Sequence, residues 1–270
     1  MSSAPAYGRA VLAVLKRDLL IFVSYRARLL GQFLGAAAAV TLFFYVSRLV
    51  DTPQFPSPED YFAFALIGVL FLRALVATLS GVVGMVRQEL VAGTFERMVT
   101  SPLGPTAGTA AMMLFPFALA LFLSVATLAF AAIVFGAPLE WSTVPLALPV
   151  AALVALALAP FCLLIAAAVL VLKQATAAVR FFIIAISVVA GFYFPVELLP
   201  GWISWASDVQ PFTPAIDLLR HLLVDTPLQD PVSGLVLKVA AFTAVLLPLS
   251  VLAVSTAIDI GRRRATLIEY

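Results

Sequence analysis

The sequence has few of the residues on which protein chemistry depends. Its 270 residues include one cysteine, Cys162, and one histidine, His221. A single cysteine excludes an internal disulfide and a metal site built from several cysteines, and no His-Glu-x-x-His motif is present. We therefore expect no metal site on this chain, a packing role for Cys162 and an interfacial hydrogen-bonding role for His221.

Charged residues are also scarce. They make up 11% of the chain, whereas hydrophobic residues make up 63%. A soluble domain carries about 25% charged residues, so this chain cannot cover a water-facing surface and is predicted to be an integral membrane protein. The net charge of +2 gives no indication of nucleic-acid binding. No cleavable signal peptide is expected, because the first apolar stretch follows a long basic segment.

Six stretches are long and apolar enough to cross a membrane, which takes about 20 residues. They are Leu29–Val50, Tyr61–Val86, Thr106–Phe135, Val144–Leu172, Ala175–Phe194 and Leu235–Ile258. We therefore expect an all-α polytopic membrane protein with six transmembrane helices, forming a single domain over residues 1–270.

Basic residues are distributed unequally between the two sides of these spans. If the N-terminus is cytoplasmic, three of the 16 lysines and arginines lie outside (Arg48, Arg220 and Lys238) and Arg73 lies within a span. The inside set is Arg9, Lys16, Arg17, Arg26, Arg28, Arg87, Arg97, Lys173, Arg180, Arg262, Arg263 and Arg264. The positive-inside rule then predicts that both termini are cytoplasmic.

Two cytoplasmic segments have an amphipathic pattern. Within the N-terminal region 1–28, residues 7–28 fit a helix lying in the membrane interface, or a basic segment that only sets the topology. Residues 87–102 fit a short helix that ends at Ser101-Pro102, because proline lacks an amide donor and disfavours helix before it. This second segment could dock a soluble partner, or it could be a solvated loop that reverses the chain.

The outer segment 195–224 is too apolar for a simple loop and too rich in proline for another span. Short helices that dip into the outer leaflet fit it best, with Trp202 near the interface. Backbone that breaks at membrane depth must be covered by protein or line a cavity. The segment and the residue before it are therefore a candidate extracellular gate, with the site residues Phe194, Pro195, Pro200 and Trp202.

Arg73 is the one clearly mid-span ionisable residue. A charge near the bilayer centre costs roughly 2.5–3.5 kcal/mol on insertion scales, so it normally faces protein or a water-filled cavity. Arg73 could contact an anionic or polar substrate or steady a subunit interface. It could also sit in a buried pair or contact carbonyl groups that only hold helices together.

The chain resembles the permease subunits of type-2 ABC exporters in three features. They are the six-span layout, the cytoplasmic pattern Glu89…Gly93-Thr94-Phe95-Glu96…Ser101-Pro102, and the outer pattern Phe194-Pro195…Leu199-Pro200…Pro211…Pro214…Arg220. The resemblance covers most of the chain. The family often has leucine where Phe95 stands, a difference that changes no expected role.

The resemblance implies a transport subunit rather than an enzyme. Residues 87–102 would be the coupling helix that docks a separate cytoplasmic ABC ATPase, through Glu89, Gly93, Thr94, Phe95, Glu96 and Met98. The chain itself lacks a Gly-x-x-x-x-Gly-Lys-Ser/Thr phosphate loop. No cofactor is therefore expected on it, since ATP and Mg²⁺ would bind the ATPase. Two permeases, as copies or homologues, would pair in a bacterial-type cytoplasmic membrane.

The substrate is left open between two classes. Spans rich in Phe, Leu and Ala favour a lipophilic or amphiphilic substrate, either drug or lipid-like, over a polysaccharide or glycolipid. A membrane-embedded enzyme of lipid or cell-wall synthesis would need clustered polar catalytic groups, and this chain has only scattered ones. A secondary transporter or channel would need more intramembrane carboxylates or a ring of polar residues along a pore.

Overall fold

The computed structural model describes residues 4–24, 26–49, 54–94, 104–172 and 176–263, and the secondary structure in these ranges is helical. The predicted all-α class is therefore confirmed. The elements are α1 (Ala4–Ser24), α2 (Arg26–Ser47), α3 (Pro58–Val91), α5 (Gly104–Phe135), α6 (Val144–Leu172), α7 (Thr176–Val189), the 3₁₀ turn η1 (Val196–Leu198), α8 (Gly201–Asp208), α9 (Phe212–Val224) and α10 (Val232–Arg263).

Five of the described helices are long and apolar enough to cross a membrane, namely α2, α3, α5, α6 and α10. The prediction of a spanning helix over Ala175–Phe194 is wrong in its length. Helix α7 has 14 residues, or about 21 Å at 1.5 Å per residue, against a hydrocarbon core of about 30 Å. The chain leaves the helix at Gly191, whose φ of 72° is left-handed. The predicted count of six spanning helices is therefore not confirmed.

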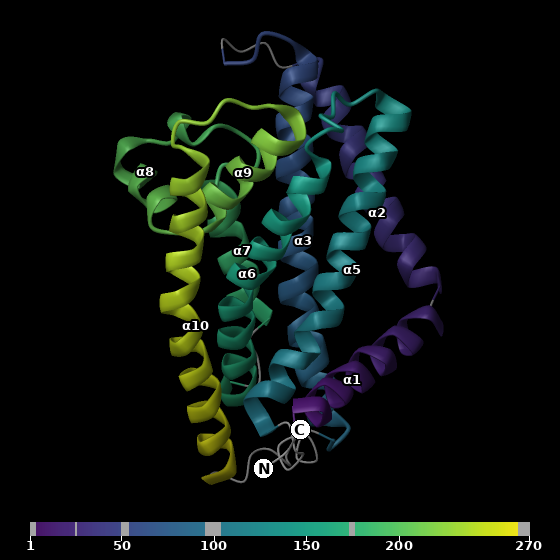
Figure 1. Ribbon diagram of the computed structural model, residues 1–270, viewed down its shortest axis with the longest axis vertical. Coiled ribbons are helices and arrows are strands. Elements are labelled where there is room, and N and C mark those ends of the chain that lie inside the picture. Colours follow the sequence, from purple (N-terminus) through teal and green to yellow (C-terminus); the bar gives the residue numbers. More distant parts are fainter. Residues whose placement is uncertain (1–3, 25, 50–53, 95–103, 173–175, 264–270) are drawn as a thin grey trace.

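Helices α3 and α6 form the centre of the bundle, and α2, α5 and α10 cover them (Figure 1). The most apolar window of α3 is 72% buried and that of α6 is 56% buried, against 17–22% for the other three. Leu75, Leu79 and Cys162 are completely or almost completely buried in this core, as expected for a packing cysteine. The outer three helices therefore present most of their apolar surface outward, as helices in contact with lipid do.

The two ends of the bundle differ (Figure 1). At one end, η1, α8 and α9 follow α7, which confirms that the segment 195–224 is built from short helices. At the other end, α1 lies obliquely and packs against α5 and α2, close to the end of α3. Helix α1 covers most of the stretch 7–28 and ends at Ser24, and residues 26–28 belong to α2. Residues 1–3 and 264–270 lie outside the described ranges, while α1 begins and α10 ends at this same end of the bundle.

Candidate functional site

Helix α3 ends in a Schellman motif within the predicted coupling segment 87–102. The amide of Gly93 donates to the carbonyl of Leu90 (3.1 Å), and the amide of Thr94 donates to the carbonyl of Glu89 (3.0 Å). Gly93 has a φ of 65°, a conformation that glycine adopts without steric cost. The prediction of one continuous helix over 87–102 is therefore wrong at Gly93, which ends α3 and does not continue it.

An ion pair joins the end of α3 to α1. The Arg17 guanidinium lies 2.8 Å from the Glu89 carboxylate, and the Glu89 side chain is only 14% exposed. The Thr94 hydroxyl donates a second hydrogen bond to the same carboxylate. Glu89 and Thr94 are thus predicted site residues that the structure brings together, and Arg17 is a partner that the sequence analysis did not single out. We call Arg17, Asp18, Glu89 and Thr94 the α1–α3 junction.

Asp18 is the buried member of the α1–α3 junction. It is 5% exposed, and Arg17 Nη2 lies 2.9 Å from its Oδ1 atom. Its Oδ2 atom accepts no hydrogen bond from the residues that the structure describes. Burial raises the pKa of Asp18, and the nearby Arg17 opposes that shift. The junction therefore holds two carboxylates around one guanidinium, so removing Arg17 would leave two carboxylates without their cation.

The remaining predicted coupling residues, Phe95, Glu96 and Met98, lie outside the described residues. Their roles stay predictions. The structure places the α1–α3 junction immediately before them in the chain, because Thr94 is the last described residue of this segment.

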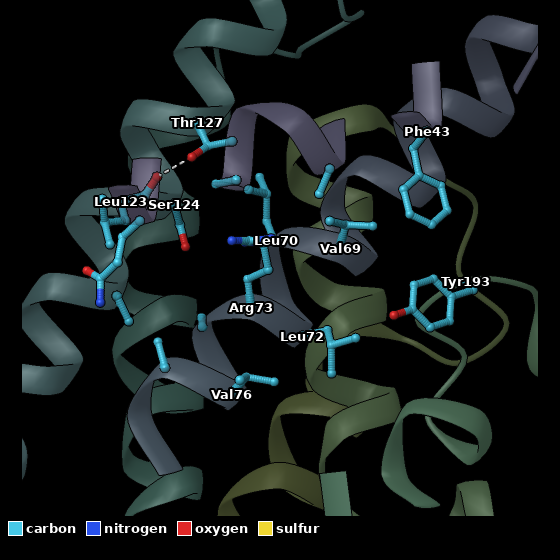
Figure 2. Close-up of a pocket in the computed structure, with 16 residues that line it drawn as sticks. Phe43, Val69, Leu70, Leu72, Arg73, Val76, Leu123, Ser124, Thr127 and Tyr193 are labelled. Atoms are coloured by element: carbon cyan, nitrogen blue, oxygen red, sulfur yellow. Dashed lines mark hydrogen bonds between the residues drawn. The ribbon is translucent and has the colours of Figure 1, made fainter. Parts of the chain in front are cut away.

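Arg73 lines a pocket of about 450 Å³ between α2, α3 and α5 (Figure 2). The side chains of Arg73 and Ser124 point into the space between α3 and α5, and Tyr193 points its hydroxyl towards this region from the other side. The Tyr193 ring stacks on Phe43, with ring centroids 5.6 Å apart. The rest of the lining is mostly aliphatic: Ala36, Ala39, Val69, Leu70, Leu72, Ala74, Val76, Ala77, Ala120 and Leu123.

Among the described residues, no carboxylate or carbonyl group pairs with the Arg73 guanidinium. Its Nη2 atom reaches α2, where a β-carbon on Gly35 would lie 3.1 Å away. Gln32, also in the lining, has a buried Oε1 atom that accepts no hydrogen bond. The pocket therefore contains a cation and an amide oxygen that the described part of the chain leaves without partners.

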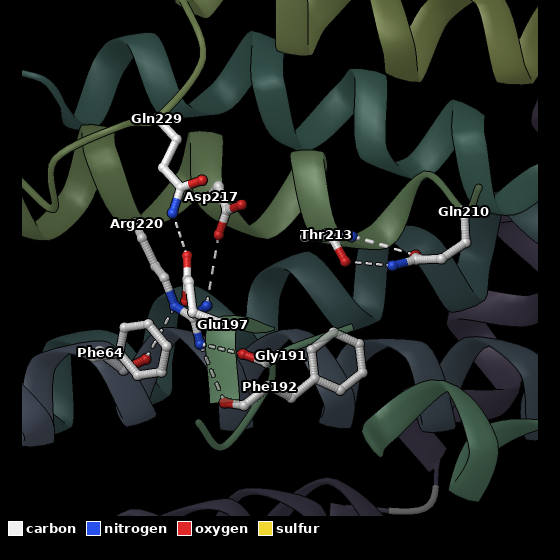
Figure 3. A network of polar contacts seen from close by, with 9 residues as sticks. All are labelled: Phe64, Gly191, Phe192, Glu197, Gln210, Thr213, Asp217, Arg220 and Gln229. Atoms are coloured by element: carbon white, nitrogen blue, oxygen red, sulfur yellow. Dashed lines mark hydrogen bonds and ion pairs between the residues drawn. The ribbon is translucent and has the colours of Figure 1, made fainter. Parts of the chain in front are cut away.

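A buried arginine, Arg220 in α9, holds the break after α7 (Figure 3). It is 2% exposed. Its guanidinium donates to the carbonyl oxygens of Phe64 (3.3 Å), Gly191 (2.8 Å) and Phe192 (3.2 Å). It also lies 3.4 Å from the centre of the Phe64 ring and 3.7 Å from the Asp217 carboxylate. We call this arrangement the Arg220 pin.

The Arg220 pin satisfies backbone groups that the end of α7 leaves open. The described part of the chain offers no other donor to the carbonyls of Gly191 and Phe192. The break also packs tightly on α3, because a β-carbon on Gly68 would lie 1.7 Å from the Phe192 carbonyl oxygen. Sequence reasoning counted Arg220 as an outside charge and as the last residue of the outer motif, and gave it no structural role. An arginine in the apolar stretch of α9 is nevertheless a signal that it needs a buried partner.

The four predicted gate residues surround this break but do not converge on one point. Phe194 is half-buried between α7 and η1. Pro195 and Pro200 directly precede η1 and α8, with φ values of −58° and −56° that suit the proline ring. Trp202 is 76% exposed, and its carbonyl accepts a hydrogen bond from the Trp205 indole (2.9 Å). The prolines therefore position the short helices, and the tryptophans face outward.

The helices and polar groups described above identify the general class of the protein. An apolar helical bundle with five helices able to span a membrane, an oblique helix at one end and a broken helical segment at the other is a multi-pass membrane protein. Its polar groups form no cluster of metal ligands among the described residues. The ionic clusters described above lie at the two ends of the bundle, and Arg73 lies in a pocket between helices.

The family described as ABC-2 type transporter matches residues 9–224, from α1 to the end of α9. This range is well over half of the chain, so the protein belongs to the ABC-2 type transporter membrane family. It is therefore a transmembrane ABC transporter subunit and a transport permease component, as the resemblance implied. Membership also implies an ABC ATPase partner. No curated protein matches the chain.

Proposed function

We propose that this chain is the permease subunit of an ATP-driven exporter. It moves a lipophilic or amphiphilic substrate out of the cytoplasm or the inner leaflet of a bacterial-type cytoplasmic membrane. A separate ATPase subunit binds ATP and Mg²⁺ and hydrolyses the nucleotide, and a second permease copy or homologue completes the pathway. Both termini are cytoplasmic, which agrees with the positions of α1 and the end of α10 at one end of the bundle.

The observation that carries this proposal is the α1–α3 junction. The Arg17–Glu89 pair connects α1 to α3 near the start of the proposed coupling segment 87–102. A force applied by the ATPase to Phe95, Glu96 and Met98 would therefore reach both helices together. In this proposal, Glu89 acts mainly through Arg17, because its carboxylate is already engaged within the chain.

The rest of the path is provided by α3 itself. From Glu89 the same helix runs past Arg73 to Phe64, where it accepts a hydrogen bond from Arg220. One helix therefore connects the proposed ATPase contact, the intramembrane pocket and the outer break. The mostly aliphatic lining of the pocket supports an amphiphile rather than a sugar polymer as the substrate.

A charge exchange tests the role of the α1–α3 junction. Arg17→Glu and Glu89→Arg each place like charges opposite one another, and we expect each to lower substrate export while ATP hydrolysis continues. The double variant restores the pair with its charges reversed and should recover part of the export. Lys16→Glu is the matched control, since Lys16 is the exposed neighbour of Arg17 on α1.

The docking role is tested separately with Glu96→Ala combined with Met98→Ala. We expect less ATPase to co-purify with the tagged permease, without loss of the permease from the membrane. Unchanged co-purification and unchanged export in both sets of variants would contradict the assignment of residues 87–102 as the ATPase contact.

A further inference from the structure

The Arg73 pocket lies near the middle of the bundle's length along α3. Arg73 follows Tyr61 by twelve residues on α3, or roughly 18 Å at 1.5 Å per residue, which is near the middle of a hydrocarbon core of about 30 Å. A guanidinium at that depth is stable only if it faces protein groups, water or a ligand. The described residues supply no anion to it, so the pocket lacks a counter-charge of its own.

The shape of the pocket suits a small ligand. Its volume of about 450 Å³ lies within the 300–1,000 Å³ that is typical of small-molecule sites, which are mostly apolar with a few polar groups. Small side chains on three helices, Ala36, Ala39, Ala77 and Ala120, leave this space open. In Figure 2, Ser124 lies on one side of Arg73 and Tyr193 on the other, and aliphatic side chains such as Leu72 and Val76 lie around them.

The chemistry of the lining specifies the ligand further. The Arg73 guanidinium offers several N–H donors, and these match the oxygens of a carboxylate, phosphate or sulfate group. The Ser124 hydroxyl and the Tyr193 phenol also line the pocket and are further hydrogen-bond donors. The unpartnered Gln32 Oε1 atom accepts hydrogen bonds and suits a hydroxyl or amide N–H beside the acidic group.

We propose that the Arg73 pocket binds an acidic amphiphile, with its anionic headgroup on Arg73 and its alkyl or acyl chain against the aliphatic lining. The identification of this amphiphile as the exported substrate rests on the proposed function, but its binding to the permease does not. The same headgroup chemistry belongs to single-chain solutes and to anionic phospholipids of the surrounding membrane, and the experiment separates these two sources.

Two pairs of variants test separately the charge of Arg73 and the free volume of the pocket. Arg73→Gln removes the charge, whereas Arg73→Lys keeps it without the planar guanidinium. Gly35→Leu inserts a side chain where the Arg73 Nη2 atom now lies, 3.1 Å from a β-carbon at that position. Gly31→Leu is its control, because it lies one turn away on α2 and nothing lies within 4 Å of a β-carbon there.

The test measures equilibrium binding of tritiated hexadecyl sulfate and hexadecanol to the full chain in phosphatidylcholine nanodiscs, with empty nanodiscs subtracted. We expect wild type, Arg73→Lys and Gly31→Leu to prefer the sulfate over the alcohol. We expect Arg73→Gln and Gly35→Leu to bind the sulfate roughly 10- to 100-fold more weakly, the range for losing hydrogen bonds to a charged group. Hexadecanol binding should not change in Arg73→Gln.

Phosphatidylglycerol added to the nanodiscs shows whether the bound amphiphile is a single-chain solute or an anionic phospholipid of the membrane. If it displaces hexadecyl sulfate from wild type, the pocket takes a membrane lipid, and if it does not, the pocket takes a single-chain solute. Equal binding of hexadecyl sulfate by wild type and Gly35→Leu, or by wild type and a monodisperse Arg73→Gln, overturns the proposal. Because no ATPase is present, this failure is distinct from a failure of the ATPase contact, which would leave the binding intact.

Discussion

Replacing Arg220 should destabilise the outer break more than any surface substitution does. In Arg220→Met, the carbonyls of Gly191 and Phe192 lose their hydrogen-bond donor. Each buried acceptor left without a partner costs about 1–3 kcal/mol, so two of them cost about 4 kcal/mol in total. The Phe64 carbonyl loses only an additional bond, because it remains in α3. At about 2–4 °C per kcal/mol for a chain of this size, the expected decrease in melting temperature is about 8–16 °C.

The assay is thermal unfolding of the purified permease in detergent, followed by the loss of the monodisperse peak in size-exclusion chromatography. Lys238→Met is the matched control. Its ion pair with Asp230 is exposed, and exposed pairs contribute little to stability. Arg220→Lys should fall between wild type and Arg220→Met, because one ammonium group cannot reach three carbonyls in the fork geometry of a guanidinium. Equal melting temperatures for wild type and Arg220→Met would refute the assignment of Arg220 as the group that holds the break.

Three further outcomes are expected. Gly68→Ala should prevent correct packing of the break, because its β-carbon would lie 1.7 Å from the Phe192 carbonyl oxygen, whereas Gly84→Ala on the same helix has nothing within 4 Å; comparing folded yields in size-exclusion chromatography checks this. Burial raises the pKa of Asp18, so the folded state holds this proton more tightly than the unfolded state does and stability falls as the pH rises through that pKa. Asp18→Asn should lessen this decrease in melting temperature between pH 4 and pH 7, and equal slopes for the two proteins would contradict it. A cysteine added after Tyr270 should resist a membrane-impermeant maleimide in intact cells and react after lysis; labelling from outside would overturn the predicted orientation.

Sequence analysis predicted those elements that depend mainly on the residues within them. The long apolar runs of α3 and α6 and the amphipathic pattern of α1 all became helices within a few residues of the predicted bounds. Pro195 and Pro200 indicated that short helices follow them, as η1 and α8 do, because proline fixes its own φ and disfavours a helical residue before it. Such local effects need no knowledge of neighbouring elements.

The errors arose where tertiary contacts decide the conformation. The apolar residues continue past Val189, so the predicted span ran to Phe194. Helix α7 can end earlier because Arg220, about 30 residues further along the chain, donates a hydrogen bond to the Gly191 carbonyl. In the same way, Gly93 is compatible with a helix on a wheel diagram, whereas its left-handed φ ends α3. The partner of Glu89 was also hidden, because Arg17 lies 72 residues earlier in the chain.

A tilt of helix α3 would move different parts of the helix by different distances. Its only proline is Pro58 in the first turn, while α5, α6 and α10 each contain a proline in their interior. The stretch from Phe64 to Glu89 is therefore a proline-free helical segment of roughly 38 Å at 1.5 Å per residue. If its outer end is held at the Arg220 pin, a tilt of about 10° moves the Glu89 end by roughly 6–7 Å. Arg73 lies nine residues from Phe64, or roughly 14 Å at 1.5 Å per residue, so the same tilt moves it only about a third as far. A large movement at the Glu89 end of α3 therefore becomes a small one at the pocket.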